Sequence, residues 1–219
     1  MDKTIQVLPA ILTDSPKDLK SMVKQTESFT DRVQFDIMDG KFVPSHSISA
    51  KHIAGLKTKL LWEAHLMVKH PESYLGEFKQ AGAQRIVFHY EATVSPREVI
   101  SKARGLDVGI GLAINPDTTI ADISHIIDDL DCVLFMSVQP GFYGSKFIPE
   151  VLDKIADFRH TYPDMEIGID GGVKEDNIAR VAASGVSSIC VGSAIFRQPD
   201  PTESYNRLMA LANKASDSF

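Results

Sequence analysis

The sequence lacks most of the features that mark a secreted or membrane protein. It has two cysteines in 219 residues. No apolar run approaches the roughly 18 residues needed to cross a bilayer. Cys132 and Cys190 both lie inside apolar runs, so we expect reduced thiols in the core rather than a disulfide. The first residues, MDKTIQVLPAIL, have neither the basic start nor the long apolar stretch of a signal peptide. We therefore expect a cytoplasmic protein with no membrane partner.

An excess of basic charge is also lacking. The chain has 23 Lys and Arg against 29 Asp and Glu, a net charge of −6. Nucleic-acid binding needs clustered Lys and Arg, so we expect no nucleic-acid partner. Hydrophobic residues make up 43% of the chain and charged residues 24%, which is typical of a globular protein with one large or two small domains.

What the chain does have is a regular alternation of short apolar runs with helical segments. The segments begin with signals such as Ser15-Pro16, an N-cap followed by proline in the first helical turn. Eight such repeats predict the α/β class and a single (β/α)8 barrel domain over residues 1–219. A doubly wound sheet is the nearest alternative, but GIGLAI (109–114) lacks the third glycine of a dinucleotide-binding motif. The predicted strands are 5–11, 32–38, 61–67, 85–90, 108–114, 132–138, 165–170 and 188–192.

Several strands carry polar residues at positions predicted to face the barrel interior. In VQFDIMDGKFVP (33–44), Gln34 and Asp36 alternate with apolar residues, with no Lys or Arg close by to neutralise the acid. Alternate residues of a barrel strand point inward, and the same parity holds for His65, His89 and Asp170. These lie near the C-terminal ends of their strands, where barrel enzymes place their chemistry. A buried carboxylate needs an opposite charge or a metal, so these residues form a candidate site.

Each polar residue also has a plainer interpretation. A single inward histidine is more often a hydrogen-bonded core residue, and we favour that for His89, with substrate binding as its predicted functional role. For His65, with two carboxylates near it, we favour a ligand role. Glu63 lies deeper in its strand, which favours a structural hydrogen bond. Asp39 precedes Gly40 and favours a turn.

Three methionines and three glycine-rich loops complete the candidate site. Met38, Met67 and Met136 lie at the ends of three strands, where they either fill the core or form an apolar floor beneath a substrate. Glycine-containing segments follow the last three strands, at 139–147, 170–177 and 191–196. Barrels commonly bind phosphate in such loops, and the loop after the sixth strand has glycines that suit a lid. The predicted phosphate-binding and closing residues are Gly141, Gly144, Gly171, Gly172, Gly192 and Ser193.

Taken together, these segments resemble the ribulose-phosphate 3-epimerase family over nearly the whole chain. The resemblance rests on LPAIL, FDIMDGKFVP, AHLMVKHP, FHYEA, INPDT, MSVQPGFYGSKFIP, IGIDGGVKEDNI and VGSAIF. It implies an isomerase of carbohydrate metabolism, in the pentose phosphate pathway, that interconverts D-ribulose 5-phosphate and D-xylulose 5-phosphate. It also implies a homo-oligomer.

The resemblance further implies roles for individual residues. Asp36 and Asp170 would be the two acid/base groups, and both would bind a divalent zinc, iron, manganese or cobalt ion together with His65. Inverting a carbon beside a ketone requires removing a proton on one face and returning one on the other, which takes two bases. The metal would stabilise the enediolate, and the methionines would exclude water.

The chain departs from the family pattern at three positions. Gln34 stands where the family has His, Ala10 where it has Ser, and Gln139 where Asn is more usual. Gln34 remains a candidate fourth ligand, but a neutral amide oxygen binds zinc or iron more weakly than imidazole. Ala10 offers no hydrogen bond. The losses at Gln34 and Ala10 fall at the implied metal–substrate centre, whereas the change at Gln139 is milder, and the phosphate loops and both aspartates remain.

Two alternatives to this epimerase stay open. One is a related isomerase or lyase acting on another sugar phosphate. The other is a non-catalytic sugar-phosphate sensor that has lost its metal, against which the retention of Asp36, His65 and Asp170 weighs. Decarboxylation is disfavoured, because related decarboxylases carry a lysine on an early strand and the register from Asp36 to Asp39 has none.

Overall fold

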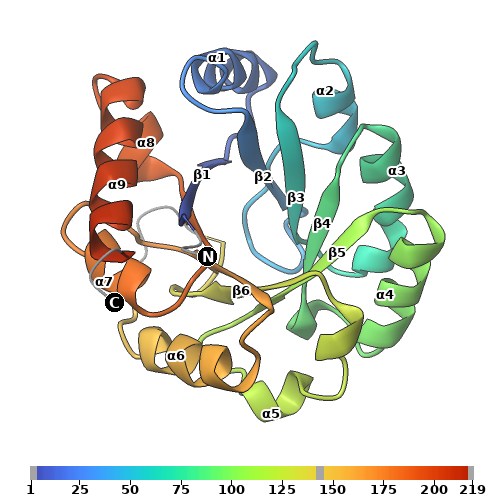
Figure 1. Cartoon of the computed structure of the whole chain (residues 1–219). Helices are drawn as coiled ribbons and strands as arrows, with labels where there is room; N and C mark the ends of the chain where they lie inside the picture. The colour runs from blue at the N-terminus through green and yellow to red at the C-terminus, as the bar shows by residue number, and fades with distance from the viewer. Residues whose placement is uncertain (1–3, 142–145, 217–219) are drawn as a thin grey trace.

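The computed structural model describes residues 4–141 and 146–216. Its eight parallel strands form a closed barrel in chain order, with β1 paired to both β2 and β8. Helices surround the strands (Figure 1). The predicted (β/α)8 barrel is therefore confirmed. The strands are β1 (Gln6–Ile11), β2 (Arg32–Met38), β3 (Leu61–Met67), β4 (Arg85–His89), β5 (Gly109–Ile114), β6 (Cys132–Met136), β7 (Glu166–Asp170) and β8 (Ser188–Val191).

Within the described ranges, the connections contain α-helices and three short 3₁₀ turns. The C-terminal helix α9 packs against α7 and β1 and closes the outer ring beside the first strand (Figure 1). No helix within the described ranges is both long and apolar enough to cross a membrane. The helices are α1 (Pro16–Thr26), α2 (Ala50–Ala54), α3 (Leu75–Gln80), α4 (Pro96–Gly105), α5 (Ile120–Ile123), α6 (Val151–Thr161), α7 (Ile178–Ala183), α8 (Ser193–Phe196) and α9 (Pro201–Ser216), and the 3₁₀ turns are η1 (Pro71–Ser73), η2 (Tyr90–Ala92) and η3 (Ile127–Asp129).

Local sequence signals fix the first helix. The Ser15 hydroxyl accepts a hydrogen bond from the backbone N–H of Asp18 at 3.2 Å, and Pro16 is the first helical residue. The hydroxyl therefore satisfies one of the free N–H groups at the helix start. Leu19 and Val23, four residues apart, are buried on the face that packs against the barrel.

The turn after β2 is built around Asp39. Its Oδ1 accepts hydrogen bonds from the backbone N–H groups of Lys41 at 2.9 Å and Phe42 at 3.0 Å. Its Oδ2 accepts one from the N–H of Lys69, beyond β3. The prediction of a turn-forming Asp39 is confirmed, and the same side chain ties the ends of two neighbouring strands together.

The strand register decides which side chains meet inside the barrel. Between β2 and β3, Asp36 lies opposite His65, and Met38 lies opposite Met67. Phe35 has the other parity, is fully buried and packs edge-on against Trp62 in the layer under the helices, with ring centroids 5.4 Å apart. One strand thus supplies the site on one face and the outer core on the other.

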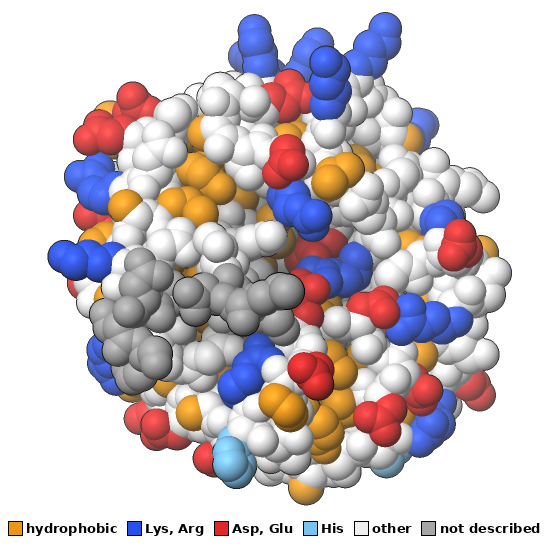
Figure 2. Space-filling model, in the orientation of Figure 1, with side chains coloured by type: hydrophobic (Ala, Val, Ile, Leu, Met, Phe, Trp, Pro, Cys, Tyr) orange, Lys and Arg blue, Asp and Glu red, His pale blue; other side chains and the backbone are white. Residues whose placement is uncertain are grey.

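The opposite, N-terminal end of the barrel is held by ion pairs. Arg85 contacts Glu63 at 2.6 Å and Glu166 at 2.9 Å, joining β3, β4 and β7. The structural role predicted for Glu63 is confirmed. Figure 2 shows acidic and basic side chains interspersed over most of one face of the molecule, and both kinds meet in the hollow at its centre.

Replacing Phe35 tests the outer core. Phe35→Ala should lower the free energy of unfolding by about 3–5 kcal/mol, because it removes a fully buried ring and leaves a cavity. Val94→Ala is the matched control: Val94 is fully exposed, so its loss should change stability by about 0.5 kcal/mol or less. Urea unfolding followed by circular dichroism measures both, and equal midpoints for the two variants would contradict this account of the packing.

Candidate active site

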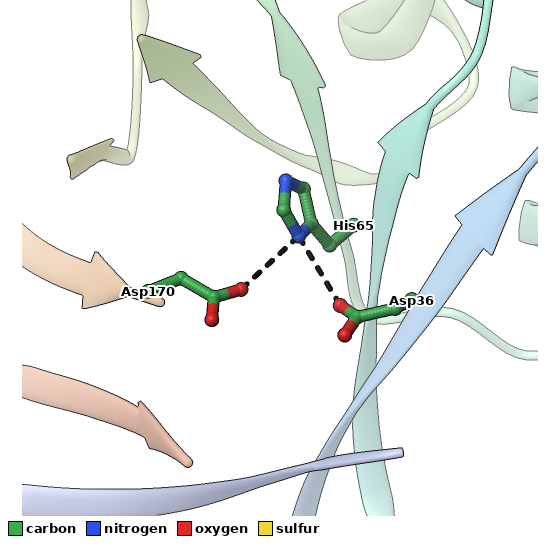
Figure 3. A group of neighbouring side chains, drawn as sticks. All are labelled: Asp36, His65 and Asp170. Atoms are coloured by element: carbon green, nitrogen blue, oxygen red, sulfur yellow. Dashed lines mark hydrogen bonds and ion pairs between the residues drawn. The ribbon is translucent and has the colours of Figure 1, made fainter. Parts of the chain in front are cut away.

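A cavity opens at the C-terminal ends of the strands, as the sequence predicts for a barrel enzyme. Asp36 on β2, His65 on β3 and Asp170 on β7 all line it. The three side chains point toward one another across the barrel (Figure 3). The barrel therefore brings together, from β2, β3 and β7, the residues selected by inward parity and by position near the strand ends.

The two carboxylates meet at one imidazole nitrogen. His65 Nδ1 lies 3.2 Å from Asp36 Oδ1 and 3.3 Å from Asp170 Oδ2. One ligand atom from each of the three residues lies within 4.8 Å of the other two. In Figure 3 the second oxygen of each carboxylate lies on the side away from His65. Each acid thus has one oxygen directed to the centre of the group and another directed elsewhere.

Gln34 forms a second bridge between the acids. Its Nε2 donates to Asp36 Oδ1 at 2.9 Å and to Asp170 Oδ2 at 2.8 Å. Its Oε1 accepts a hydrogen bond from the Cys190 thiol at 3.1 Å. Cys190 and Cys132 are both buried free thiols, as predicted. The Gln34 amide therefore presents a donor, not an oxygen ligand, to the two acids.

Burial and mutual charge set the protonation of the group. Burial, followed by the nearby charge of Asp170, raises the pKa of Asp36 to about 6. Burial on its own lowers the pKa of His65, but hydrogen bonds to Asp170 and Asp36 outweigh it and raise that pKa to about 10. Without another cation, His65 is therefore an imidazolium. It supplies the positive charge that the buried carboxylates require.

His89, predicted as a substrate-binding residue, lies behind His65 and does not line the cavity. Its Nε2 is 2.9 Å from His65 Nε2, and its side chain is fully buried. Burial lowers the pKa of His89 to about 4, so it is neutral. The alternative prediction, a hydrogen-bonded core histidine, describes this position.

The other predicted substrate-binding residues surround the cavity. Met38, Met67 and Met136 line it at the ends of β2, β3 and β6, which is the arrangement of an apolar floor. Gly144 falls outside the described residues. The loop residues that line the cavity are Gly141, Gly171, Gly172, Gly192 and Ser193.

Gly171 and Gly172 follow β7 in a conformation that other residues rarely adopt. Their φ angles are +114° and +65°. A Cβ on Gly171 would lie 2.5 Å from Val138 Cγ2, and one on Gly172 would lie 3.1 Å from the backbone nitrogen of Phe147. Glycine is therefore required for this close packing of backbone at the cavity wall.

The donor set suits a divalent transition metal. Two carboxylate oxygens and one imidazole nitrogen, from the buried Asp36 and His65 and the partly buried Asp170, lie close together and are ligands that zinc, iron and manganese accept. The second ring nitrogen of His65 is held by His89, the outer hydrogen bond that metal-binding histidines usually have. The residues present therefore fit the implied metal.

Comparison with known proteins decides the family. The model of the ribulose-phosphate 3-epimerase family matches residues 6–196. The ribulose-phosphate 3-epimerase of Synechocystis is 36% identical over 93% of this chain and 92% of its own, and that of Escherichia coli K12 is 35% identical over 90% and 92%. The chain belongs to the ribulose-phosphate 3-epimerase family. A structure of 3-hexulose-6-phosphate synthase from Salmonella typhimurium, 13% identical, shares the fold with a TM-score of 0.75 over 96% of this chain and 100% of its own.

Two departures from the ribulose-phosphate 3-epimerase pattern lie side by side. Ala10 on β1 and Gln34 on β2 are register partners, and Ala10 lines the cavity. For Gln34 to serve as the predicted fourth ligand, its amide must rotate so that Oε1 replaces Nε2 beside the acids. Gln139, the third departure, is exposed and donates to Asp117 at 3.2 Å, away from the acids.

Two serines that the sequence analysis did not select hold the acidic residues in place. The Ser47 hydroxyl donates to the backbone carbonyl of Asp36 at 2.8 Å. The Ser137 hydroxyl lies 3.0 Å from the carbonyl of Asp170 and 2.6 Å from that of Gly171. Ser137 was visible as the one polar residue in the apolar run 132–138. Nothing in the sequence distinguishes Ser47 from the other serines of its loop.

The Gln34 amide gives a test of the metal shell. Gln34→His should tighten divalent-metal binding by about tenfold, or about 1.4 kcal/mol, because imidazole offers a nitrogen lone pair where the amide presents a donor. Zinc titration against a competing chelator measures the change. Gln139→His is the control, since that side chain lies outside the acid cluster. Unchanged or weaker binding by Gln34→His, relative to wild type, contradicts this view of position 34.

Proposed function

We propose that the protein interconverts D-ribulose 5-phosphate and D-xylulose 5-phosphate by inverting C3 with two bases. The observation that carries the proposal is the convergence of Asp36 and Asp170, from β2 and β7, on one nitrogen of His65. Membership of the ribulose-phosphate 3-epimerase family supports a sugar-phosphate substrate. Two acids that line one cavity from different strands, β2 and β7, suit a reaction that must work on both faces of a carbon.

The proton transfers follow from the placement of the acids. One carboxylate takes the proton from C3, the electron pair moves into the C2–C3 bond to give an enediolate, and the other carboxyl group returns a proton to the opposite face. The reverse reaction exchanges the two roles. In the metal-free protein, burial and the charge of Asp170 raise the pKa of Asp36 to about 6, close to the pH range in which a carboxyl group can both take up and release a proton. A divalent cation held by Asp36, His65 and Asp170 would supply positive charge beside the enediolate oxygens.

The rest of the cavity would bind and shield the substrate. Met38, Met67 and Met136 would cover the carbon chain and exclude water, which strengthens the attraction between charges. The backbone at Gly171, Gly172, Gly192 and Ser193 would hold the phosphate by its N–H groups. The homo-oligomer remains a proposal that rests on the family resemblance, and the cytoplasmic location remains one that rests on the reduced core cysteines.

Hydrogen exchange at C3 tests the proposed reaction. The protein, stripped of metal and then given one divalent ion at a time, is incubated with D-ribulose 5-phosphate in heavy water. We expect deuterium at C3 and D-xylulose 5-phosphate as product with at least one ion. Binding of the sugar phosphate without exchange, with every ion, would favour a non-catalytic sensor instead. Exchange only with a different sugar phosphate would favour the related isomerase.

Replacing each acid separately tests the two-base assignment. Asp36→Asn and Asp170→Asn should each lower kcat for epimerisation by about 10²- to 10⁴-fold, because one proton transfer loses its base. Each variant should exchange C3 of one epimer much faster than that of the other, with opposite preferences in the two variants. Asp153→Asn, on the exposed face of α6, is the control. The same preference in both variants would show that the acids do not serve opposite faces.

The glycine pair gives a test of the phosphate end. Gly171→Ala should raise KM at least about tenfold, because a Cβ 2.5 Å from Val138 must displace the loop. Gly76→Ala is the control, since a Cβ there has open space and alanine suits helix α3. Steady-state kinetics with the two epimers measures both variants. A wild-type KM for Gly171→Ala would remove this loop from the substrate site.

A further inference from the structure

On the side away from the two acids, His65 contacts the buried His89, and His89 in turn faces Glu91, whose side chain reaches the surface. His65 Nε2 lies 2.9 Å from His89 Nε2, with the two rings nearly parallel and their centroids 5.0 Å apart. The ring of Phe42 packs on His89, with centroids 4.9 Å apart. His89 is therefore enclosed between the ring of His65 and the apolar ring of Phe42.

The contacts of His65 fix where its protons must be. Its Nδ1 faces both acids and would bind the cation, so the proton of a neutral ring is on Nε2. That proton points at His89 Nε2, which can accept it only if His89 carries its own proton on Nδ1. When His65 is an imidazolium, Nε2 is protonated as well. A His89 ring protonated on Nδ1 therefore suits both the neutral and the imidazolium state of His65. When His65 is an imidazolium, only its Nδ1 proton has to leave before that nitrogen can bind a cation.

The outer nitrogen of His89 leads to Glu91. His89 Nδ1 is buried and makes no hydrogen bond among the described residues, and Glu91 Oε2 lies 3.5 Å from it. The other oxygen of Glu91, Oε1, is held in place by the N–H of Asn115 at 2.8 Å and by the hydroxyl of Thr118. Two donors thus hold one oxygen of Glu91 and leave the other oxygen facing His89.

We propose that Glu91, acting through His89, is a positioning residue for the metal-binding nitrogen of His65. Its carboxylate keeps the proton of His89 on Nδ1, His89 Nε2 then accepts from His65 Nε2, and His65 Nδ1 is left free to bind a cation. The proposal rests on the metal site of the proposed function. It assigns a role to the FHYEA segment beyond filling the core.

Glu91→Gln tests this role of Glu91, because it replaces the hydrogen-bond acceptor that faces His89 Nδ1 with a hydrogen-bond donor. The N–H of Asn115 and the hydroxyl of Thr118 still require an oxygen, so the new NH₂ group faces His89 Nδ1. That donor favours a proton on His89 Nε2, directed against the proton of His65. We expect the affinity for zinc, measured by competition with a chelator, to fall about ten- to hundredfold. A zinc affinity equal to that of wild type would overturn the positioning role proposed for Glu91.

Thr118→Val is the matched control. It removes a donor to Glu91 Oε1 and leaves the carboxylate oxygen that faces His89. If Glu91 acts through His89, Thr118→Val should lower the thermal stability but keep the zinc affinity within about twofold of wild type. A twofold change corresponds to only about 0.4 kcal/mol. An equal loss of zinc affinity in both variants would show that Glu91 acts only through the stability of its loop, and would overturn the proposal.

A tautomer measurement on the metal-free wild-type protein decides the proposal even if a variant does not fold. Two-bond nitrogen–proton NMR correlations of the protein, labelled in its seven histidines, report which ring nitrogen is protonated. We expect His89 to be protonated on Nδ1 in wild type and on Nε2 in Glu91→Gln. A wild-type His89 protonated on Nε2 would overturn the positioning role proposed for Glu91. A wild-type protein that binds no divalent ion would instead overturn the metal site on which the proposal rests.

Discussion

The site depends on one constraint: a buried carboxylate, Asp36, and a partly buried one, Asp170, lie together and need a shared positive charge. Asp36 and Asp170 lie close enough to repel, and water cannot screen them well at the base of the cavity. As an imidazolium, His65 supplies this positive charge. A divalent cation bound among the same three residues would supply it instead. The group can therefore hold the charges that the proposed reaction needs while remaining compatible with a stable barrel.

The barrel makes this arrangement rigid. Strand pairing sets Asp36 beside His65, and the closed ring brings β7 within reach of both. Ser47 and Ser137 then fix the backbone on which the two acids are carried. Small errors in the position of a base cost much of its rate, so in the proposed reaction these hydrogen bonds would support the chemistry as well as the stability of the barrel.

The fold and the centre of the site were predictable because both follow from local pattern. The alternation of apolar runs and helix signals gave the barrel, and strand parity selected Asp36, His65 and Asp170. Asp39 was predictable as a turn because an aspartate before glycine commonly bonds to its own backbone.

The remaining contacts were not predictable because they join residues far apart in the sequence. The side chain of Gln34 spans both acids as a donor, whereas its sequence position suggested an oxygen ligand. Parity placed His89 inward but did not show that His65 would stand between it and the cavity. The contact of Glu91 with the loop after β5 depends on how two loops pack, which no periodicity encodes.

Anomalous diffraction from crystals of the metal-loaded protein, recorded at the absorption edge of the added ion, tests the central claim most directly. The account predicts one strong peak between Asp36, Asp170 and Nδ1 of His65, with Nε2 of His65 still on His89. A peak elsewhere in a protein shown to bind the ion, or the two carboxylates turned away from each other, would contradict it.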